Sequence, residues 1–170
     1  MVEVMRRSRA PFTAWHNPFL PGGQFAYAAP MLKYKLLHPQ LLAALGEAGH
    51  GSKILIADGN YPAGVRVPPR AARIYLNLAP GLVTVTDVLK VLVDAVPIEA
   101  AEVMVPADGP EPSVFAEFRQ LLGPELPLQV HERFAFYRAV LETETAIVIA
   151  TGEQRTYSNV LLTIGVVPPP

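Results

Sequence analysis

The chain has 170 residues, 51% of them hydrophobic, and its mean hydropathy of +0.27 indicates enough apolar surface for one large core. A net charge of −1 and a pI near 6.4 argue against a nucleic-acid partner, because phosphate binding needs a concentrated basic face. The absence of cysteine, of a signal peptide and of any apolar run of about 18 residues excludes disulfides and cysteine-bound zinc, and favours a cytoplasmic protein with no membrane partner.

Residues 1–30 differ in character from the rest of the chain. They contain a cluster of arginines, scattered prolines and five aromatic residues that follow neither a helical nor a strand period. We interpret this segment as an extension outside the fold. It is either a stretch upstream of a true start at Met31 or an arm whose aromatic side chains pack on a neighbouring subunit. Residues 31–170 are the predicted domain.

From Met31 onward, predicted helices alternate with predicted strands. A short helix is expected after His38, with Pro39 in its first turn and Gly49 at its C-cap, followed by a buried strand that ends before Asp58. The pattern then predicts strands over 73–78, 102–105, 128–131, 146–150 and 160–164, with helices over 84–96, 113–122 and 132–140. This alternation indicates an α/β fold, a three-layer α/β/α sandwich around a mainly parallel six-stranded sheet.

The loop that follows the first strand is the first candidate for function. Asp58 opens a segment rich in glycine and proline that extends to Arg70, longer than a simple turn. In open α/β sheets, ligands bind beyond the carboxyl ends of the strands, and Asp58 lies at such an end. We therefore expect a small polar ligand site there.

Several enzyme classes lack their motifs in this chain. No G-x-G-x-x-G follows a strand and no P-loop is present, so dinucleotide and nucleoside-triphosphate sites are not predicted. No G-x-S-x-G or H-E-x-x-H motif occurs, and the four histidines do not have metal-ligand spacing. We expect neither a metal nor a cofactor.

The remaining candidates are polar residues at the ends of predicted elements, and each has a structural alternative. His50 would cap the preceding helix through its dipole, and Asp58 would form an Asx-turn. Arg133 would be a solvated helix residue, and Tyr137 would be a core residue. Tyr157 and Asn159 would be turn residues. The candidates are His50, Asp58, His131, Arg133, Tyr137, Tyr157 and Asn159.

Several motifs together resemble one known family. They are Met31-Leu32-Lys33, Gly49-His50-Gly51, Ile56-Ala57-Asp58-Gly59-Asn60-Tyr61-Pro62, Arg133-Phe134-Ala135-Phe136-Tyr137, Thr151-Gly152-Glu153, Tyr157-Ser158-Asn159-Val160-Leu161-Leu162 and Gly165-Val166. In this order, over residues 31–167, they resemble the RbsD/FucU family of sugar mutarotases, which contains fucose mutarotases and D-ribose pyranases.

The resemblance implies roles for the candidates. His50 matches the catalytic acid/base of the family, and Asp58 matches a sugar-binding aspartate. Arg133 matches a substrate-binding arginine of the fucose branch, whereas His131 matches a substrate-binding histidine of the ribose branch. Tyr157 and Asn159 fall on a Tyr-x-Asn substrate segment, and the Phe-Ala-Phe-Tyr run that includes Tyr137 is similar to the fucose branch. The loop from Gly64 to Arg70 departs from the family pattern.

The implied function is the interconversion of monosaccharide anomers, of L-fucose or a similar sugar, without a cofactor. Eight extended residues between His50 and Asp58 span up to about 26 Å, so either the chain folds back or the site is shared between copies. The family's pentameric rings and decamers fit a shared site in a homo-oligomer. The alternatives are a D-ribose pyranase, a non-catalytic sugar-binding module associated with uptake, and a structural ring protein.

Overall fold

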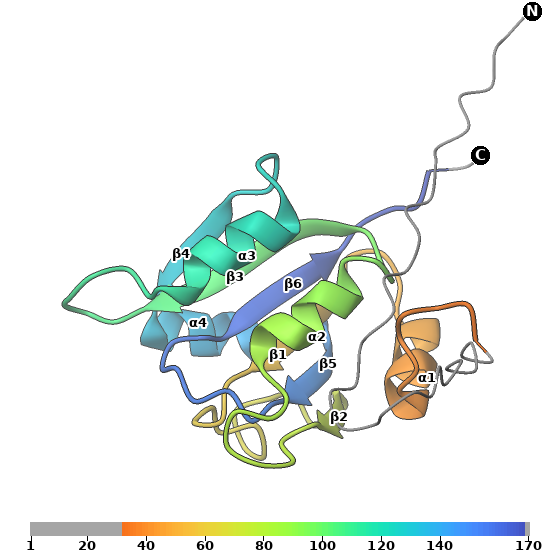
Figure 1. Cartoon of the computed structure of the whole chain (residues 1–170), viewed down its shortest axis with the longest axis horizontal. Helices are drawn as coiled ribbons and strands as arrows, with labels where there is room; N and C mark the ends of the chain where they lie inside the picture. Colours follow the sequence, from red (N-terminus) through yellow and green to blue (C-terminus); the bar gives the residue numbers. More distant parts are fainter. Residues whose placement is uncertain (1–31, 169–170) are drawn as a thin grey trace, which may run out of the picture. The chain divides into compact units, whose positions relative to one another are not determined.

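The computed structural model describes residues 32–168, so the expectations for residues 1–30 lie outside the described residues. In chain order, the elements of this part are α1 (Pro39–Glu47), β1 (Lys53–Ala57), β2 (Ala72–Tyr75), α2 (Val85–Leu92), β3 (Ile98–Val105), α3 (Val114–Leu122), β4 (Leu128–Glu132), α4 (Arg133–Val140), β5 (Thr145–Ala150) and β6 (Val160–Ile164) (Figure 1).

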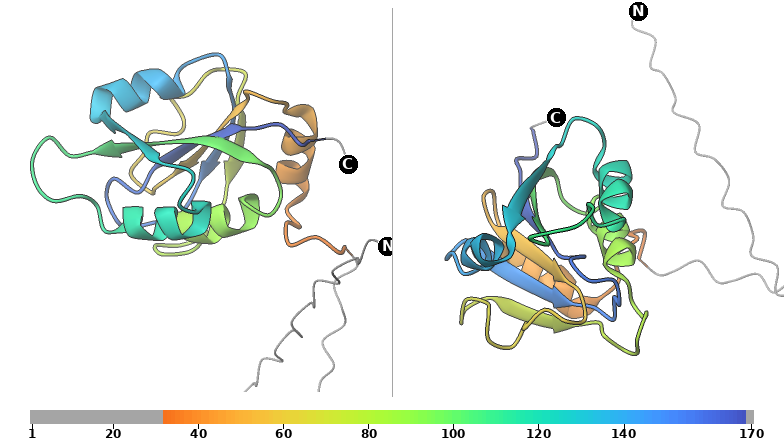
Figure 2. Two further views of the ribbon diagram at one scale, coloured as in Figure 1. Left: turned by 90° about the horizontal axis from the view of Figure 1, so that it is seen from above. Right: turned by 90° about the vertical axis from the view of Figure 1, so that its left-hand side faces the viewer.

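The six strands form one sheet in the order β2-β5-β1-β6-β3-β4. Strands β1 to β5 all run in the same direction, and only β6, between β1 and β3, runs antiparallel to its neighbours. Helices α2 and α3 cover one face of the sheet and α4 covers the other (Figure 2). The predicted three-layer α/β/α fold with a mainly parallel six-stranded sheet is therefore confirmed.

The central strand β1 is buried on both faces. Ile54 and Ile56 belong to the core that includes α2 and α3, and Leu55 and Ala57 belong to the core that includes α4. All four side chains are fully buried. A strand covered on both faces has no side exposed to solvent, so apolar and polar residues do not alternate along it. This explains why its sequence is a continuous apolar run. The same burial leaves Asp58 and His50 beyond the opposite ends of the strand.

Several predicted boundaries were wrong. Helix α2 begins as expected, with a capping box between Thr84 and Asp87, but ends at Leu92 rather than at 96. The amides of Ala95 and Val96 both donate to the carbonyl of Leu92, in a turn that closes the helix early. Helix α1 ends at Glu47 with Ala48 as its C-cap, so Gly49 lies beyond the cap.

Two strands also differ in length from the prediction. Strand β3 begins at Ile98, four residues before the expected start, because it pairs with β6 from that point. Strand β2 ends at Tyr75 rather than at 78. Beyond it, the loop of residues 76–84 crosses the end of β5. A Cβ at Gly152 would lie 2.3 Å from the carbonyl oxygens of Ala79 and Leu82, so only glycine permits this crossing.

Candidate functional site

Asp58 and Asn159 lie at the carboxyl-end rim of the sheet, where β1 ends and the antiparallel β6 begins. Both are buried, with exposed fractions of 4% and 0%. The amide of Asn159 donates to Asp58 Oδ2 at 2.8 Å, and the backbone N–H of Asp58 donates to Asn159 Oδ1 at 2.9 Å. The sequence predicted both residues as ligand contacts, and the structure brings them together as a reciprocal pair.

The Asp58 carboxylate also accepts backbone hydrogen bonds. The N–H of Asn60 donates to Oδ1 at 3.0 Å, which is the Asx-turn considered as an alternative, and the N–H of Ser158 donates to Oδ2 at 3.2 Å. Burial raises the pKa of the Asp58 carboxyl above its usual value, although these hydrogen bonds oppose the rise. Asp58 therefore joins the loops that follow β1 and precede β6.

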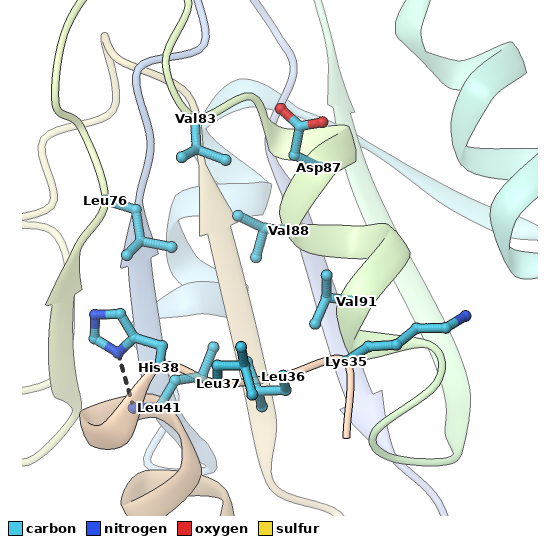
Figure 3. Close-up of a pocket in the computed structure, with 10 residues that line it drawn as sticks. All are labelled: Lys35, Leu36, Leu37, His38, Leu41, Leu76, Val83, Asp87, Val88 and Val91. Atoms are coloured by element: carbon cyan, nitrogen blue, oxygen red, sulfur yellow. Dashed lines mark hydrogen bonds between the residues drawn. The ribbon is translucent and has the colours of Figure 1, made fainter. Parts of the chain in front are cut away.

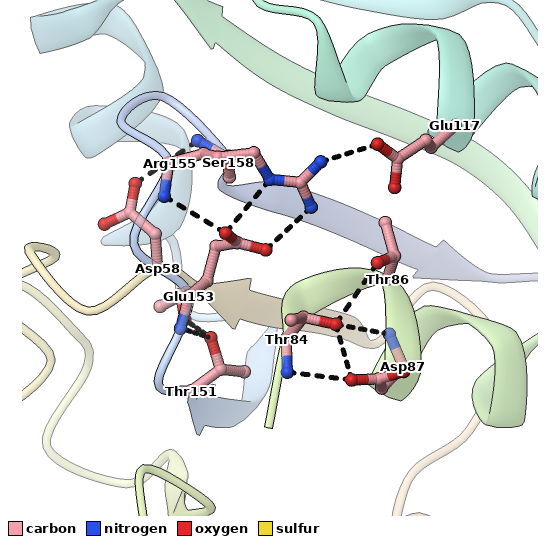
Figure 4. Close-up of polar contacts among 10 residues, drawn as sticks. Asp58, Thr84, Thr86, Asp87, Glu117, Thr151, Glu153, Arg155 and Ser158 are labelled. Carbon is pink, nitrogen blue, oxygen red and sulfur yellow. Dashed lines mark hydrogen bonds and ion pairs between the residues drawn. The ribbon is translucent and has the colours of Figure 1, made fainter. Parts of the chain in front are cut away.

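A second polar group at this rim belongs to one of the quoted family motifs but was not among the predicted site residues. Glu153 is only 4% exposed, and its carboxylate accepts two hydrogen bonds from the Arg155 guanidinium, at 3.0 and 2.8 Å (Figure 4). Arg155 also forms an ion pair with Glu117 of α3. The guanidinium of Arg155 lowers the pKa of the Glu153 carboxyl below its usual value. The available signal was a Glu-x-Arg spacing in a polar loop, which does not distinguish a buried pair from two solvated charges.

Tyr157, between Arg155 and Asn159 in the same loop, has a left-handed backbone conformation with φ of 60°. Its half-buried ring packs against the core on the α4 side of the sheet, as does Tyr137 of α4. Tyr137 also contacts Tyr61 edge to face, with ring centroids 5.4 Å apart. Tyr61 donates its hydroxyl hydrogen to the carbonyl of Arg66 at 2.9 Å, which fixes the loop after Asp58. The structure thus gives Tyr137 the packing role considered as its alternative.

His131 lies on β4, and Arg133 lies at the start of α4 directly after it. Strand β4 is three strands away from β1 in the sheet, a distance of about 14 Å at the usual strand spacing. The Nε2 of His131 is 2.8 Å from Oε2 of the buried Glu102, whose other oxygen accepts from Lys53 at 3.1 Å. Burial lowers the pKa of Lys53, but hydrogen bonds to Glu142 and Glu102 raise it above its usual value. Arg133 is exposed, with its guanidinium carbon 4.8 Å from the ring centroid of Phe134.

His50 lies at the opposite rim, in the turn between α1 and β1. The N–H of Ser52 donates to the carbonyl of Gly49 at 3.0 Å, and Gly51 has φ of +80°. A positive φ at the third residue defines a type II turn, which explains the glycine there. The exposed imidazole has its Nε2 3.1 Å from Glu99 Oε2. The alternative role of His50 was to cap the preceding helix through its dipole. In the structure Ala48 is the C-cap of that helix, and the His50 side chain pairs with Glu99 instead.

The chain therefore does not place His50 beside Asp58. The five residues of β1 separate them, a length of about 17 Å for the strand alone. Asp58, Asn159 and Tyr157 are grouped at the carboxyl-end rim, whereas His50 and Glu99 are grouped at the amino-end rim. The two groups are too far apart to contact one monosaccharide within a single copy.

A cavity of about 260 Å³ lies elsewhere, between the segment before α1, the end of β2 and α2 (Figure 3). Its walls are mainly apolar, and its polar side chains have other partners. Lys35 pairs with Asp94, His38 accepts from the N–H of Leu41 as an N-cap, and Asp87 completes the capping box of α2. None of the predicted site residues lines it. Within residues 32–168 no three His, Asp or Glu side chains are grouped as metal ligands, and no helix has the length and apolar composition to cross a membrane.

These features define an α/β protein whose candidate ligand groups are divided between the two rims of one sheet. Residues 31–167 match the model of the RbsD / FucU transport protein family, and the chain belongs to this family. It is 32% identical over 148 residues to a fucose mutarotase of Danio rerio, with 79% of this chain and 92% of the relative covered. It is 33% identical over 136 residues to a D-ribose pyranase of Paracidovorax citrulli (strain AAC00-1), with 80% and 98% covered.

A solved structure of the same family supports the fold. The structure of Bacillus subtilis RbsD complexed with D-ribose has a TM-score of 0.70 and 28% identity to this chain, and covers 81% of it and all of the solved chain. The resemblance inferred from the motifs is thus confirmed at the level of the family.

Proposed function

We propose that this protein interconverts the anomers of a monosaccharide by opening and closing the sugar ring. The observation that carries the proposal is the match of about four fifths of the chain to two relatives named for such reactions, a fucose mutarotase and a D-ribose pyranase. The reaction breaks and re-forms one carbon–oxygen bond with proton transfers and no change of oxidation state, so the proposal assigns no metal or cofactor to it. It also assigns the activity to residues 31–170 and regards residues 1–30 as an extension, since the family match begins at residue 31.

His50 is proposed as the acid/base. In ring opening, the bond between the anomeric carbon and the ring oxygen breaks as a proton leaves the anomeric hydroxyl and the ring oxygen gains one. The carbonyl then rotates, and closure on its other face re-forms the bond and reverses both proton transfers. A histidine exchanges protons near neutral pH and contributes roughly 10²–10⁴-fold to such a rate. Its exposure at the corner of a turn supports this role, because a sugar hydroxyl can reach the ring.

The carboxyl-end rim is proposed to bind the sugar. Tyr157, in the same loop as Asn159, and the exposed Arg133, at the start of α4 on the far side of the sheet, are its proposed hydrogen-bond donors. Asp58 and Asn159 are also proposed as sugar ligands, and the hydrogen bonds between them hold the loop of Tyr157 in place. Tyr137 contributes through the aromatic packing that supports this rim.

The two proposed parts of the site meet only between copies of the chain, because β1 separates His50 from Asp58. We propose a homo-oligomer, a pentameric ring or a decamer, in which His50 of one copy faces the carboxyl-end rim of another. A light-scattering mass equal to one 18.4 kDa chain in a fully active sample would contradict this assembly.

The proposed sugar is L-fucose or a similar monosaccharide, because the segment after Arg133 has the Phe-Ala-Phe-Tyr run of the fucose branch. A D-ribose pyranase is the second candidate. It is favoured by His131 and by an identity to the ribose relative as high as that to the fucose relative.

Saturation-transfer NMR tests the proposal by measuring the anomer exchange of L-fucose and D-ribose with the purified full chain. We expect faster exchange of at least one sugar, and a loss of roughly 100-fold or more in His50→Ala. His38→Asn is the matched control, because it removes another histidine but keeps an N-cap side chain for α1. Sugar binding by calorimetry with unaltered exchange would instead identify a non-catalytic binding module.

A further inference from the structure

We propose that Glu99 is a positioning residue for His50, and that Nδ1 is the imidazole nitrogen that exchanges a proton with the sugar. This inference rests on the proposed catalytic role of His50. It specifies which atom of the ring reacts and which side chain determines that choice.

The backbone around His50 is well fixed, but its ring has little packing to orient it. The N–H of Gly51 donates to the carbonyl of Ile164 at 2.9 Å, and the N–H of Ile164 donates to the carbonyl of Ser52 at the same distance. The hydroxyl of Ser52 accepts from the N–H of Gly49 at 3.1 Å. The turn is thus attached to β6, whereas the His50 side chain is 59% exposed and has glycines on both sides. A specific partner is needed to hold the ring.

Glu99 is that partner. Its Oε2 lies 3.1 Å from His50 Nε2. Glu99 belongs to β3, which is bonded to β6, the same strand that holds the turn of His50. A Cβ at Gly165 would lie 3.2 Å from the Glu99 Cβ and 3.5 Å from its Oε2, so the glycine at 165 leaves room for this side chain. The two partners therefore reach each other from neighbouring, hydrogen-bonded parts of one sheet.

The direction of the hydrogen bond determines the tautomer. An ionised carboxylate only accepts hydrogen bonds, so the proton between Glu99 and His50 must belong to Nε2. In a neutral imidazole the other nitrogen is then unprotonated, which makes Nδ1 the base. When Nδ1 gains a proton, the carboxylate of Glu99 faces the imidazolium and stabilises it, as in other histidine–carboxylate pairs.

A reaction at Nδ1 requires open space around the turn of His50. Nδ1 is the ring nitrogen nearer the backbone, so a sugar hydroxyl that reaches it must approach the turn closely. A Cβ at Gly49 or at Gly51 would contact nothing within 4 Å, so the space on both sides of His50 is open.

Nitrogen-15 NMR of the full chain labelled at histidine tests the assignment directly. Spectra are recorded well above the ordinary histidine pKa of about 6.5, and the His50 signals are identified by their loss in His50→Gln. We expect the Nε2–H tautomer in the wild-type chain. In Glu99→Ala we expect a mixture of both tautomers, with an exchange rate at saturating sugar that falls roughly tenfold while KM changes little. Asp108→Ala, which removes an exposed carboxylate beyond the other end of β3, is the control and keeps the wild-type tautomer and rate.

The outcomes separate this inference from the proposed function. An Nδ1–H tautomer in the wild-type chain, or a Glu99→Ala variant with unchanged tautomer and rate, would overturn the role of Glu99. An Nε2–H tautomer that depends on Glu99 supports the positioning contact even if His50→Ala leaves anomer exchange intact. In that case it is the catalytic role of His50, and not the pairing, that fails.

Discussion

At the scale of single residues, the buried pair of Asp58 and Asn159 combines two interpretations that the sequence left open. Asp58 was predicted either as a sugar ligand or as the start of an Asx-turn. The structure shows the turn, and it also shows a carboxylate surrounded by donors from two loops. A buried acceptor whose partners all donate is sensitive to any change that adds a hydrogen.

Asp58→Asn tests how much the fold depends on this carboxylate. The substituted amide replaces one acceptor with a donor that faces the N–H groups of Asn60 or Ser158, so we expect the free energy of unfolding to fall by about 1–3 kcal/mol. Urea unfolding measures this change. Asp108→Asn, at an exposed position, is expected to stay within about 0.5 kcal/mol of the wild type. Equal stability of all three chains would show that Asp58 has no structural role.

The sequence did not reveal which polar side chains pair with one another. Asp58 and Asn159 are 101 positions apart, and His131 and Glu102 are 29 apart. Their pairing depends on strand order and register, which hydrophobic periodicity does not specify. His50 was predicted at the end of an element, where the structure places it, but Glu99 was not singled out, because an isolated glutamate near the start of a strand has no local signature.

At the scale of elements, the pattern of helices and strands was predictable to a large extent. The central strands β1, β5 and β6 are short, mainly apolar runs, and the predicted strand over 160–164 matches β6 in both its bounds. The errors occur where pairing or turn hydrogen bonds decide, as at the start of β3 and the end of α2. The antiparallel direction of β6 also follows from its pairing, and it brings Asn159 to the rim of Asp58.

The loop between β5 and β6 has its own support, since Arg155 joins Glu153 to Glu117 of α3 (Figure 4). Arg155→Gln leaves the buried Glu153 carboxylate without its cation. Because the Arg155 side chain is 37% exposed and partly screened, we expect a loss of about 1–2 kcal/mol in unfolding free energy at pH 7. Arg119→Gln, which removes an exposed pair with Glu111, is the control and should change stability less.

The same substitution has a defined pH dependence. Arg155 lowers the folded-state pKa of Glu153 from 4.5, so the stabilisation is present above that value and is lost as the pH falls through the lowered pKa. Urea unfolding from pH 7 downward should therefore show the wild type and Arg155→Gln converging below about pH 4.5. A difference that stays constant to acidic pH would assign the effect of Arg155 to packing rather than to charge.

At the scale of the whole molecule, the strand that organises the core also divides the candidate site. Strand β1 is covered on both faces, so neither Asp58 nor His50 can fold back across it. From its length, the sequence left two alternatives: a chain that folds back, or a site that is shared between copies. The arrangement of copies could not be predicted, because hydrophobic periodicity does not show which surfaces of the folded chain contact another copy.

Mixing two inactive variants tests whether the site is shared between copies. His50→Ala removes the proposed acid/base at one rim, and Arg133→Ala removes an exposed cation at the other, so neither change disturbs the buried core. If His50 of one copy serves the rim of another, random mixing in equal amounts after dissociation leaves about one quarter of the sites with both residues intact. Saturation-transfer NMR should then show exchange well above that of either variant alone.

The control is a mixture of the His50→Ala, Arg133→Ala double variant with His50→Ala. It should stay inactive, because no site regains its histidine. Absence of recovery from the two single variants, with each confirmed to be inactive and assembled, would place both residues in the site of one copy.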